Sequence, residues 1–583
     1  MRKFSLIALS ALVASLIIWA ADWPSQSGNA QRDGWAKTEK AFTKANAKGI
    51  ELLYKYKADN QVRGLAALTA PVINGNLITY LGFKEMLVFG GSSDNVYSVD
   101  ADLNRKIWST HFDYKGDKPA AAATALCPGG LTATLTMPGS STAMGRGFGG
   151  GPPGRGVVPG APGTAPGAAA PGAAIGAGRG PAVLPPGMGP GGPARGGLFA
   201  TGFGRSGVFV AVSGDGNLHP LNTSTGADKV PPLKFLPPNA KVSSINLNDG
   251  ILYAATQDGC GGNANALYAL DMSGEDTTKG KLSVFETKGS GLAGSGGTAI
   301  ATDGTVYAEV PDGQGDVAGQ YSDTVLAFSK DLTVKDYFTP AGAGASVKKE
   351  VSGQGIAPVV FDWNGRDLVV AGGRDGRIYL LDSKSLGGAD HHTPLASTEA
   401  IASPDMKYAG NGFSGTFSSW EDTENKTRWI YASLWGPPGG SAKFGQMNGD
   451  AAHGSIVAFK LEDQGGQPVL TPAWISRDIV TPGPTATANG LVFALSSGES
   501  PREAKEDGKP YSVAEREKMA TRAVLFVLDG ASGAELYNSG TMTSAFSHSA
   551  GLAVANRRIY FTTHDNTVYA LGFMAEQPQL TGK

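Results

Sequence analysis

Leu267-Tyr268-Ala269-Leu270-Asp271 is the clearest copy of a five-residue motif that recurs along the chain. Its apolar and aromatic residues, with little charge, are typical of a short buried β-strand. Eight segments match the motif, at residues 96–100, 218–222, 267–271, 325–329, 378–382, 456–460, 525–529 and 568–572. Self-similarity of this kind is the sequence signature of a repeat architecture.

A second β-rich run precedes each copy of the motif. Examples are residues 251–255 and 368–371, and turn pairs such as Asp375-Gly376 often join the two runs. Asp-Gly between apolar runs predicts a β-hairpin. Because a small sheet cannot bury both of its faces alone, such units pack against one another in a ring. We therefore predict an all-β fold, an eight-bladed β-propeller made of four-stranded antiparallel blades.

Closure of this ring needs a strand from outside the last repeat, which ends at Phe573. The stretch Leu52-Leu53-Tyr54-Lys55-Tyr56 has the pattern of a strand but lacks a partner in its own region. We predict that this N-terminal strand completes blade eight and removes an open sheet edge.

The start of the chain predicts export. Arg2 and Lys3 precede an apolar run that extends to Trp19 and is followed by small residues. We expect residues 1–21 to be a cleavable signal peptide, with a membrane anchor as the alternative, and residues 22–583 to form one periplasmic or secreted propeller without a stable membrane anchor. The formal net charge of −2 argues against nucleic acid as a partner.

The segment 138–197 departs from the repeat pattern. Of its 60 residues, 33 are Gly or Pro, and it contains four Arg and no acidic residue. Such low-complexity sequence cannot form a core, so we predict a disordered Gly/Pro-rich insertion. It would lie within blade two, between a first strand at 131–136 and a second at 208–212. A basic binding tail is the functional alternative.

The Asp-Gly turns and Tyr-Ala-Leu-Asp strands resemble those of the PQQ-repeat propellers over about residues 22–575. The opening Asp22-Trp23-Pro24-Ser25-Gln26-Ser27-Gly28-Asn29 is similar to the Trp-containing entry segment of that family. The family includes quinoprotein alcohol dehydrogenases and a non-catalytic propeller lipoprotein of outer-membrane assembly. The resemblance implies the fold, and for the dehydrogenases it implies PQQ and Ca²⁺ bound over one face of the ring.

The positions that match the family's cofactor ligands hold other residues. Cys260 lies where the resemblance implies a calcium-binding Glu, and Ala264 lies where it implies an Arg. Asp312 could supply an oxygen ligand in the segment that matches a calcium-binding motif of the family, although the motif itself is altered. Glu350 is the sole carboxylate in the segment that would hold the catalytic base. The quinone-stacking indole and the vicinal Cys pair have no counterpart at the matching positions.

Four long loops place further candidates on one face of the predicted ring. They cover residues 258–265, 311–323, 436–454 and 499–522. Long loops on a rigid scaffold are where binding residues usually lie. Asp312, Asp316 and Asp323 are candidate calcium ligands, and ordinary turn aspartates are the alternative. In the last loop, Ser512 followed by Glu515 predicts a capped short helix.

The third long loop and its start hold the other candidates for a ligand face. Asp450 and His453 are spaced to ligate a metal or to act as a base, with a structural His in a capped loop as the alternative. Trp435 and Phe444 offer an apolar contact for a ligand, and packing over the blade edge is equally compatible with the sequence.

The two cysteines fall in loops of the same predicted face. Cys127 lies in the connection from blade one to blade two, and Cys260 lies in a loop of blade three. In an oxidising compartment we expect a disulfide between them, with two buried free thiols as the alternative.

These observations favour a binding or scaffolding module that acts through its long-loop face, on an unknown protein or small-molecule ligand and without a cofactor. The alternative is a PQQ- and Ca²⁺-dependent dehydrogenase of alcohols or related substrates with a divergent site, in which Glu350 is the candidate base.

Overall fold

The computed structural model describes residues 21–79, 82–114, 123–138, 198–199, 207–289, 291–311, 321–341, 355–373, 375–402, 412–507, 509–548 and 551–574. Internal contacts divide the chain into two units, Met1–Gly139 with Gly197–Lys583, and Ser140–Gly196. The described residues all belong to the first unit. The predicted signal peptide (1–21) and insertion (138–197) lie outside the described residues, except for Ala21 and Pro138.

The described strands form eight separate sheets with few helical turns. The first sheet contains β2 (Val72–Thr79), β3 (Gly82–Gly91), β4 (Asn95–Asp100) and β5 (Arg105–His111), and the second contains β6 (Val208–Val212), β7 (Asn217–Asn222) and β8 (Leu233–Lys234). The third sheet contains β9 (Lys241–Val242), β10 (Asn246–Asn248), β11 (Ile251–Gln257), β12 (Ala266–Asp271) and β13 (Lys281–Glu286). The fourth sheet contains β14 (Thr298–Ile300), β15 (Val306–Val310), β16 (Thr324–Phe328) and β17 (Val334–Phe338).

The fifth sheet contains β19 (Val359–Trp363), β20 (Arg366–Gly372), β21 (Ile378–Asp382) and β22 (Ala396–Ser397). The sixth sheet contains β18 (Ile356–Ala357), β23 (Phe413–Asp422), β24 (Thr427–Trp435), β25 (Gln446–Met447), β26 (Gly454–Gln464) and β27 (Gln467–Ile475). The seventh sheet contains β28 (Ala486–Ala488), β29 (Leu491–Ser496), β30 (Val524–Asp529) and β31 (Glu535–Asn538), and the eighth contains β1 (Glu51–Lys57), β32 (Ala553–Ala555), β33 (Arg558–Thr563) and β34 (Thr567–Gly572). The helical segments are η1 (Ala47–Gly49), η3 (Cys260–Gly262), η4 (Gly388–Asp390) and α2 (Val513–Met519).

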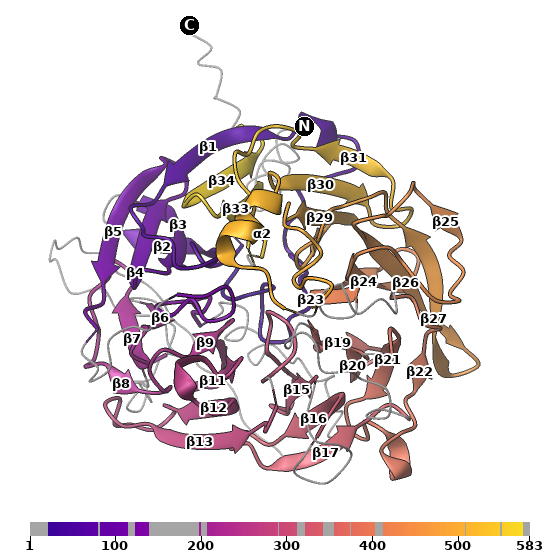
Figure 1. Ribbon diagram of the computed structural model, residues 1–583, viewed down its shortest axis with the longest axis horizontal. Helices are drawn as coiled ribbons and strands as arrows, with labels where there is room; N and C mark the ends of the chain where they lie inside the picture. The colour runs from indigo at the N-terminus through magenta and orange to yellow at the C-terminus, as the bar shows by residue number, and fades with distance from the viewer. Residues whose placement is uncertain are drawn as a thin grey trace, which may run out of the picture. The chain divides into compact units, whose positions relative to one another are not determined.

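The sheets of this unit are arranged about a common centre, so the fold is an all-β propeller (Figure 1). The repeated motif forms β4, β7, β12, β16, β21, β26, β30 and β34. These strands are buried on both faces, as in β16 and β34, because each lies between two neighbouring sheets. The outermost strands, such as β5 and β13, consist mostly of exposed or half-buried residues.

The prediction of eight four-stranded blades is wrong in its count. Among the described residues, seven sheets have four or more strands, whereas β6-β7-β8 has three. The segment 131–136, predicted as its first strand, forms isolated bridges instead, from Thr136 to Val210 and from Thr134 to Ser244 of the next sheet. Because the segment divides its backbone contacts between two sheets, it does not form a continuous ladder with β6.

An N-terminal strand closes the ring. β1 pairs antiparallel with β34, from Glu51 opposite Gly572 to Lys57 opposite Thr567. The last sheet therefore has the order β1-β34-β33-β32, and the two ends of the propeller share one sheet (Figure 1). This is the closure that the sequence predicts from residues 52–56, and it covers the edge that β34 would otherwise expose.

The N-terminal segment 22–36 follows the inner edges of the sheets in chain order. Its backbone makes hydrogen bonds with an N···O distance of 2.8–3.0 Å to Ile73 (β2), Ile300 (β14), Val360 (β19), Ser419 (β23) and Thr487 (β28). Each bond satisfies a backbone group at an inner strand that would otherwise lack a partner. One continuous segment thus links five sheets that are far apart in the sequence.

Arg32 is the charged residue at the middle of this segment, and its side chain is completely buried. The guanidinium donates to the backbone oxygens of Gln26 (2.6 Å), Thr298 (3.2 Å) and Ile245 (3.2 Å), and to Ser244 Oγ (3.3 Å). Burial lowers the pKa of Arg32 to about 9, because removal from water disfavours the charged form. Carbonyl dipoles from three parts of the chain therefore stabilise this cation.

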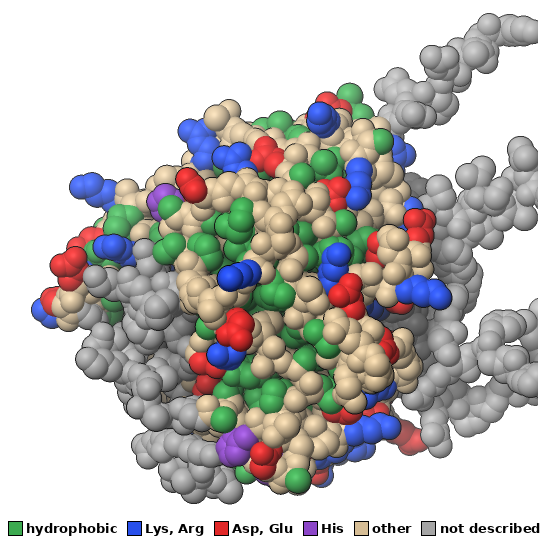
Figure 2. All heavy atoms as spheres, turned by 90° about the vertical axis from the view of Figure 1, so that its right-hand side faces the viewer, with side chains coloured by type: hydrophobic (Ala, Val, Ile, Leu, Met, Phe, Trp, Pro, Cys, Tyr) green, Lys and Arg blue, Asp and Glu red, His purple; other side chains and the backbone are tan. Residues whose placement is uncertain are grey.

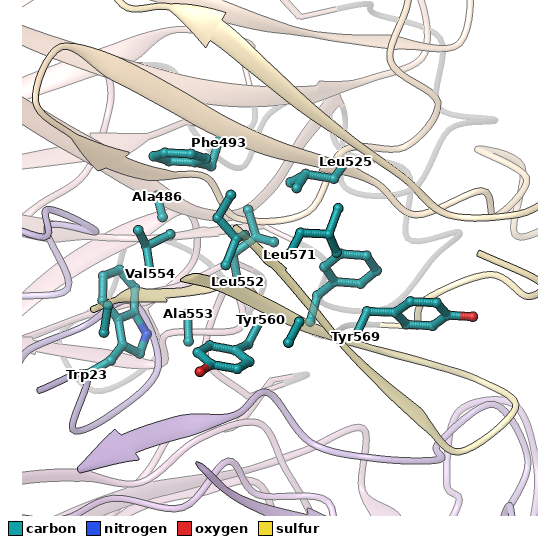
Figure 3. Close-up of a cluster of buried hydrophobic side chains, with 14 of the residues drawn as sticks. Trp23, Ala486, Phe493, Leu525, Leu552, Ala553, Val554, Tyr560, Tyr569 and Leu571 are labelled. Atoms are coloured by element: carbon teal, nitrogen blue, oxygen red, sulfur yellow. The ribbon is translucent and has the colours of Figure 1, made fainter. Parts of the chain in front are cut away.

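Apolar side chains fill the space between neighbouring sheets. In the cluster of Figure 3, Phe493 and Leu525 of the seventh sheet face Leu552 and Leu571 of the eighth, and Trp23 of the N-terminal segment lies beside them. All five side chains are at most 4% exposed. Because hydrogen bonds within a sheet cannot join two sheets, this close packing is what holds neighbouring blades together.

The surface carries mixed charge. Figure 2 shows acidic and basic side chains interspersed with apolar ones on one side of the molecule. This pattern agrees with the small net charge and offers no extended basic surface on that side. No helix in the described part of the chain combines the length and apolarity that crossing a bilayer requires.

A disulfide joins Cys127 to Cys260, the pair that the sequence predicts. The two Cα atoms lie 5.3 Å apart, and 133 residues separate the two cysteines in the chain. Cys127 lies between the first and second sheets, and Cys260 begins η3 between β11 and β12. The bond therefore fixes loops from different blades against each other.

We expect Arg32→Ala to destabilise the propeller. The change removes four hydrogen bonds and leaves buried acceptors without a donor, and each such acceptor costs about 1–3 kcal/mol. Thermal unfolding followed by circular dichroism should show a midpoint lowered by roughly 5 °C or more. Arg105→Ala, at an exposed position of β5, is the matched control and should retain the wild-type midpoint. Equal midpoints for the two variants would contradict this role of Arg32.

The double variant Cys127→Ser, Cys260→Ser should lose about 3–5 kcal/mol of unfolding free energy, because the disulfide closes a long loop in the unfolded chain. Urea denaturation with and without dithiothreitol measures this effect. Reductant should destabilise the wild-type protein and leave the double variant unchanged. A wild-type protein that is insensitive to reductant after complete thiol exposure would be inconsistent with a stabilising disulfide.

Candidate functional site

A cavity of about 130 Å³ lies where the sheets converge. Its wall is formed by connections between sheets and by the ends of β11, β24 and β29. The lining residues fall within 66–70, 125–134, 241–243, 257–258, 294–295, 414–415, 481–484, 495–499 and 547–548, together with Trp435. Because segments from several sheets of the ring contribute to it, we call it the axial cavity. It has room for several waters or a small organic group.

A buried network of charged side chains forms one wall of the axial cavity. His548 Nδ1 lies 2.9 Å from Glu499 Oε1 and 3.0 Å from Glu499 Oε2. Arg516 Nη2 lies 3.3 Å from Glu499 Oε1 and 3.1 Å from Glu503 Oε1. The side chains of Glu499 and Arg516 are 5% and 6% exposed, and that of His548 is 14% exposed. The network is thus shielded from bulk water. Ion pairs that are exposed to bulk water contribute little to stability.

Glu499 is ionised in this network. Burial raises the pKa of Glu499, but the imidazole of His548 and the guanidinium of Arg516 together outweigh that effect, and the pKa lies below its ordinary value. An ionised carboxylate can only accept hydrogen bonds, so His548 Nδ1 is the donor. In the neutral ring, Nε2 then carries the lone pair, and within the described part of the chain it has no hydrogen-bond partner.

Helix α2 positions the cation of this network. Ser512 Oγ accepts a hydrogen bond from Glu515 N at 3.3 Å, and Glu515 Oε2 accepts one from Ser512 N at 2.8 Å. This capping box is the one that the sequence predicts. The helix lies inside the ring of outer strands in Figure 1, and Arg516 is its buried residue. The long loop 499–522 thereby supplies both a carboxylate and its counter-ion.

Hydroxyl groups without partners also line the axial cavity. Ser547 Oγ and Ser295 Oγ are buried and have no hydrogen-bond partner among the described residues. A buried polar group that lacks a protein partner normally bonds to water or to a ligand. Lys241 Nζ, also in the lining, lies 2.8 Å from Asp258 Oδ2. The cavity therefore offers donors and acceptors that the fold itself does not use.

Two aromatic residues predicted for the ligand face lie in different environments. Trp435 lines the axial cavity, and its Nε1 donates to Pro482 O at 2.9 Å, which fixes the indole at the wall. Phe444 instead packs edge-on against Phe459 with ring centroids 5.5 Å apart, and it does not line the cavity.

Asp450 and His453, the other two residues of that predicted face, do not pair with each other. His453 Nδ1 lies 2.8 Å from Asp478 Oδ2, and its backbone N donates to Asp478 Oδ1 at 2.7 Å. The imidazole is more than half exposed, and Asp450 is exposed as well. Neither side chain reaches the axial cavity.

The predicted calcium and base residues are only partly covered by the structure. Asp312, Asp316 and Glu350 lie outside the described residues. Asp323 is buried with φ of 50°, a turn conformation that Asp adopts readily, directly before β16. In the ranges that the structure describes, no three His, Cys, Asp or Glu side chains gather as a metal-binding group.

A second histidine network lies in the second sheet, away from the axial cavity. Ser213 Oγ lies 3.0 Å from His219 Nε2, and His219 Nδ1 lies 3.1 Å from Asp228 Oδ1. However, Ser213 Oγ lies only 2.5 Å from Asp215 Oδ1, so its single hydrogen is directed to that carboxylate. The ring of Phe112 stacks 3.9 Å from the imidazole. The hydroxyl is therefore part of a turn and is not an activated nucleophile.

Sequence reasoning did not single out Glu499, Ser547 or His548. Glu499 was recognised only as the first residue of a long loop, and the other two lie in the connection from β31 to β32. The sequence signal that could have found them is their position in the chain. Connections between blades lie on the same face of the propeller as the long loops.

Comparison with known proteins gives similarity of fold only. No protein-family model matches the chain, and no curated protein matches it. A solved structure described as a europium-containing methanol dehydrogenase is similar with a TM-score of 0.56 and 9% identity, over 95% of this chain and 98% of that one. A quinohemoprotein alcohol dehydrogenase from Pseudomonas putida HK5 is similar with a TM-score of 0.53 and 11% identity, over 97% of this chain and 82% of that one.

Proposed function

We propose that this protein is a dehydrogenase of alcohols or related small organic substrates, that its site is the axial cavity, and that PQQ is its electron acceptor. The observation that carries this proposal is the buried pair Glu499–His548 in the cavity wall. The fold likeness to a methanol dehydrogenase and an alcohol dehydrogenase supports the choice of chemistry.

The lining of the axial cavity fits the organic part of PQQ. PQQ is a planar orthoquinone with carboxylate groups, so its site needs an aromatic surface, hydroxyl donors and a cation. Trp435 provides an aromatic surface, and Lys241, which is paired with Asp258, provides a cation; these two residues would hold the cofactor. When bound, PQQ would supply the two-electron acceptor for the oxidation.

A calcium ion does not fit the described lining. Hard cations need several oxygen ligands, and the described residues contain no cluster of three carboxylate or other ligating side chains. We therefore propose that the described residues bind the quinone directly, and we assign no calcium ligand. Asp258 is already paired with Lys241, and Glu499 with His548 and Arg516.

A binding or scaffolding role through the long-loop face is the second candidate function. The exposed Met447 on the edge strand β25 favours it, because its side chain is 58% exposed. Two observations favour the cavity instead: Trp435 faces inward to the cavity wall, and Phe444 is used for packing. We also propose export to an oxidising compartment, which the Cys127–Cys260 disulfide supports.

Purified protein should bind PQQ with a micromolar dissociation constant, measured by quenching of tryptophan fluorescence in parallel titrations with and without Ca²⁺. Trp435→Leu should weaken binding at least tenfold, because the indole at the cavity wall is lost. Trp363→Leu is the matched control, since Trp363 lies in β19 away from the cavity, and it should bind like the wild type.

The loaded protein should also reduce an artificial dye with a primary alcohol as the electron donor. Absence of saturable PQQ binding up to about 100 µM, with or without Ca²⁺, would contradict the proposed function. Binding that Trp435→Leu leaves unchanged would place the quinone outside the axial cavity.

A further inference from the structure

The segment that carries Ser547 and His548 is fixed on both sides. Ser547 N donates to Ser497 O at 2.8 Å, and His564 N donates to Phe546 O at 2.7 Å. The segment is therefore held between the end of β29 and the turn that joins β33 to β34. Ser547 is a lining residue of the axial cavity and is 1% exposed, and its buried hydroxyl has no partner among the described residues.

Glu499 is held as firmly as the imidazole that it contacts. Its backbone N donates to Ser497 Oγ at 3.1 Å, and its backbone oxygen accepts from Thr481 Oγ1 at 2.9 Å. Its carboxylate accepts from Arg516 and from His548. A carboxylate fixed in this way sets both the orientation and the tautomer of the histidine that it contacts.

Charged and titratable groups surround His548. Glu499, Glu503 and Arg516 form the buried ion network, and Glu517 lies 3.8 Å from His564. Burial lowers the pKa of His564, whose ring stacks on Phe546 with centroids 4.4 Å apart. Arg516, the cation nearest to the Glu499–His548 pair in this network, is already paired with Glu499 and Glu503.

We propose that His548 is the catalytic base of the axial cavity and that Glu499 is the residue that positions it. This assignment rests on the proposed function, since it names the residues of that site that receive the proton. It also names the substrate class, which is a primary or secondary alcohol small enough to enter the cavity.

The proposed step accounts for both hydrogens that leave the alcohol. The hydroxyl proton of the alcohol passes to His548 Nε2 as the O–H bond breaks. The hydrogen on the carbinol carbon would leave with the electron pair of the C–H bond, and PQQ, when bound, would supply the two-electron acceptor. A carbon–oxygen double bond forms, so the product is an aldehyde or a ketone. The imidazolium, stabilised by Glu499, then releases its proton to water.

His548→Gln should lower kcat for alcohol oxidation by about 10²- to 10⁴-fold with little change in KM, because the base is lost while binding groups remain. His453→Gln, at an exposed His–Asp pair outside the cavity, is the matched control and should behave like the wild type.

Glu499→Gln tests the positioning role with a readout that does not depend on turnover. The amide of Gln would donate to Nδ1 and favour the tautomer with its proton on Nε2, which cannot act as a base. In ¹⁵N-histidine-labelled protein without PQQ, the NMR signals of His548, assigned from His548→Gln, should move from the Nδ1–H to the Nε2–H tautomer. Thermal unfolding should first establish that both variants are folded.

The outcomes separate this inference from the proposed function. Wild-type protein that does not oxidise alcohols would overturn both. Active wild-type protein with an equally active His548→Gln variant would overturn the assignment of the base and leave the proposed function intact. An Nε2–H tautomer in the wild-type protein would overturn the role of Glu499.

Discussion

The hydrogen bonds from the N-terminal segment 22–36 to the inner strands are the constraint on which the rest of the propeller depends. Inner strands that converge on an axis expose backbone donors and acceptors that cannot pair with one another. The segment satisfies them in turn, and the buried guanidinium of Arg32 collects carbonyl oxygens from three parts of the chain. Since Thr134 Oγ1 of the cavity lining lies 3.3 Å from Gln26 Oε1, this same segment borders the axial cavity.

The site follows from this architecture. A ring of sheets brings the connections between blades together, so residues distant in sequence, such as Ser295 and Ser547, line one cavity. Among the polar groups there, the buried hydroxyls of Ser295 and Ser547 have no partner in the described part of the chain. The buried ions Glu499 and Arg516 are kept in place by a capped helix and by backbone hydrogen bonds, and Glu499 in turn fixes Nδ1 of His548.

Much of the fold could be predicted from the sequence because it depends on local patterns. The motif that forms β12 and its counterparts identified the third strands, and residues 52–56 identified the closure with β34. The first strand of the second blade was predicted wrongly, because Thr134 forms a β-bridge with Ser244, through hydrogen bonds to Ser243 and Ile245, and local pattern carries no information on such a contact. The Glu499–His548 pair could not be predicted, since its partners lie 49 residues apart and are brought together by the ring alone.

The central claim is that the axial cavity binds the quinone that accepts the electrons. A crystal structure of the protein grown with PQQ tests this claim most directly. We expect electron density for the tricyclic ring within the axial cavity, in contact with Trp435 and with its edge toward Ser547 and His548. Density for the quinone on the exposed loop 436–454, with the axial cavity containing water alone, would contradict it.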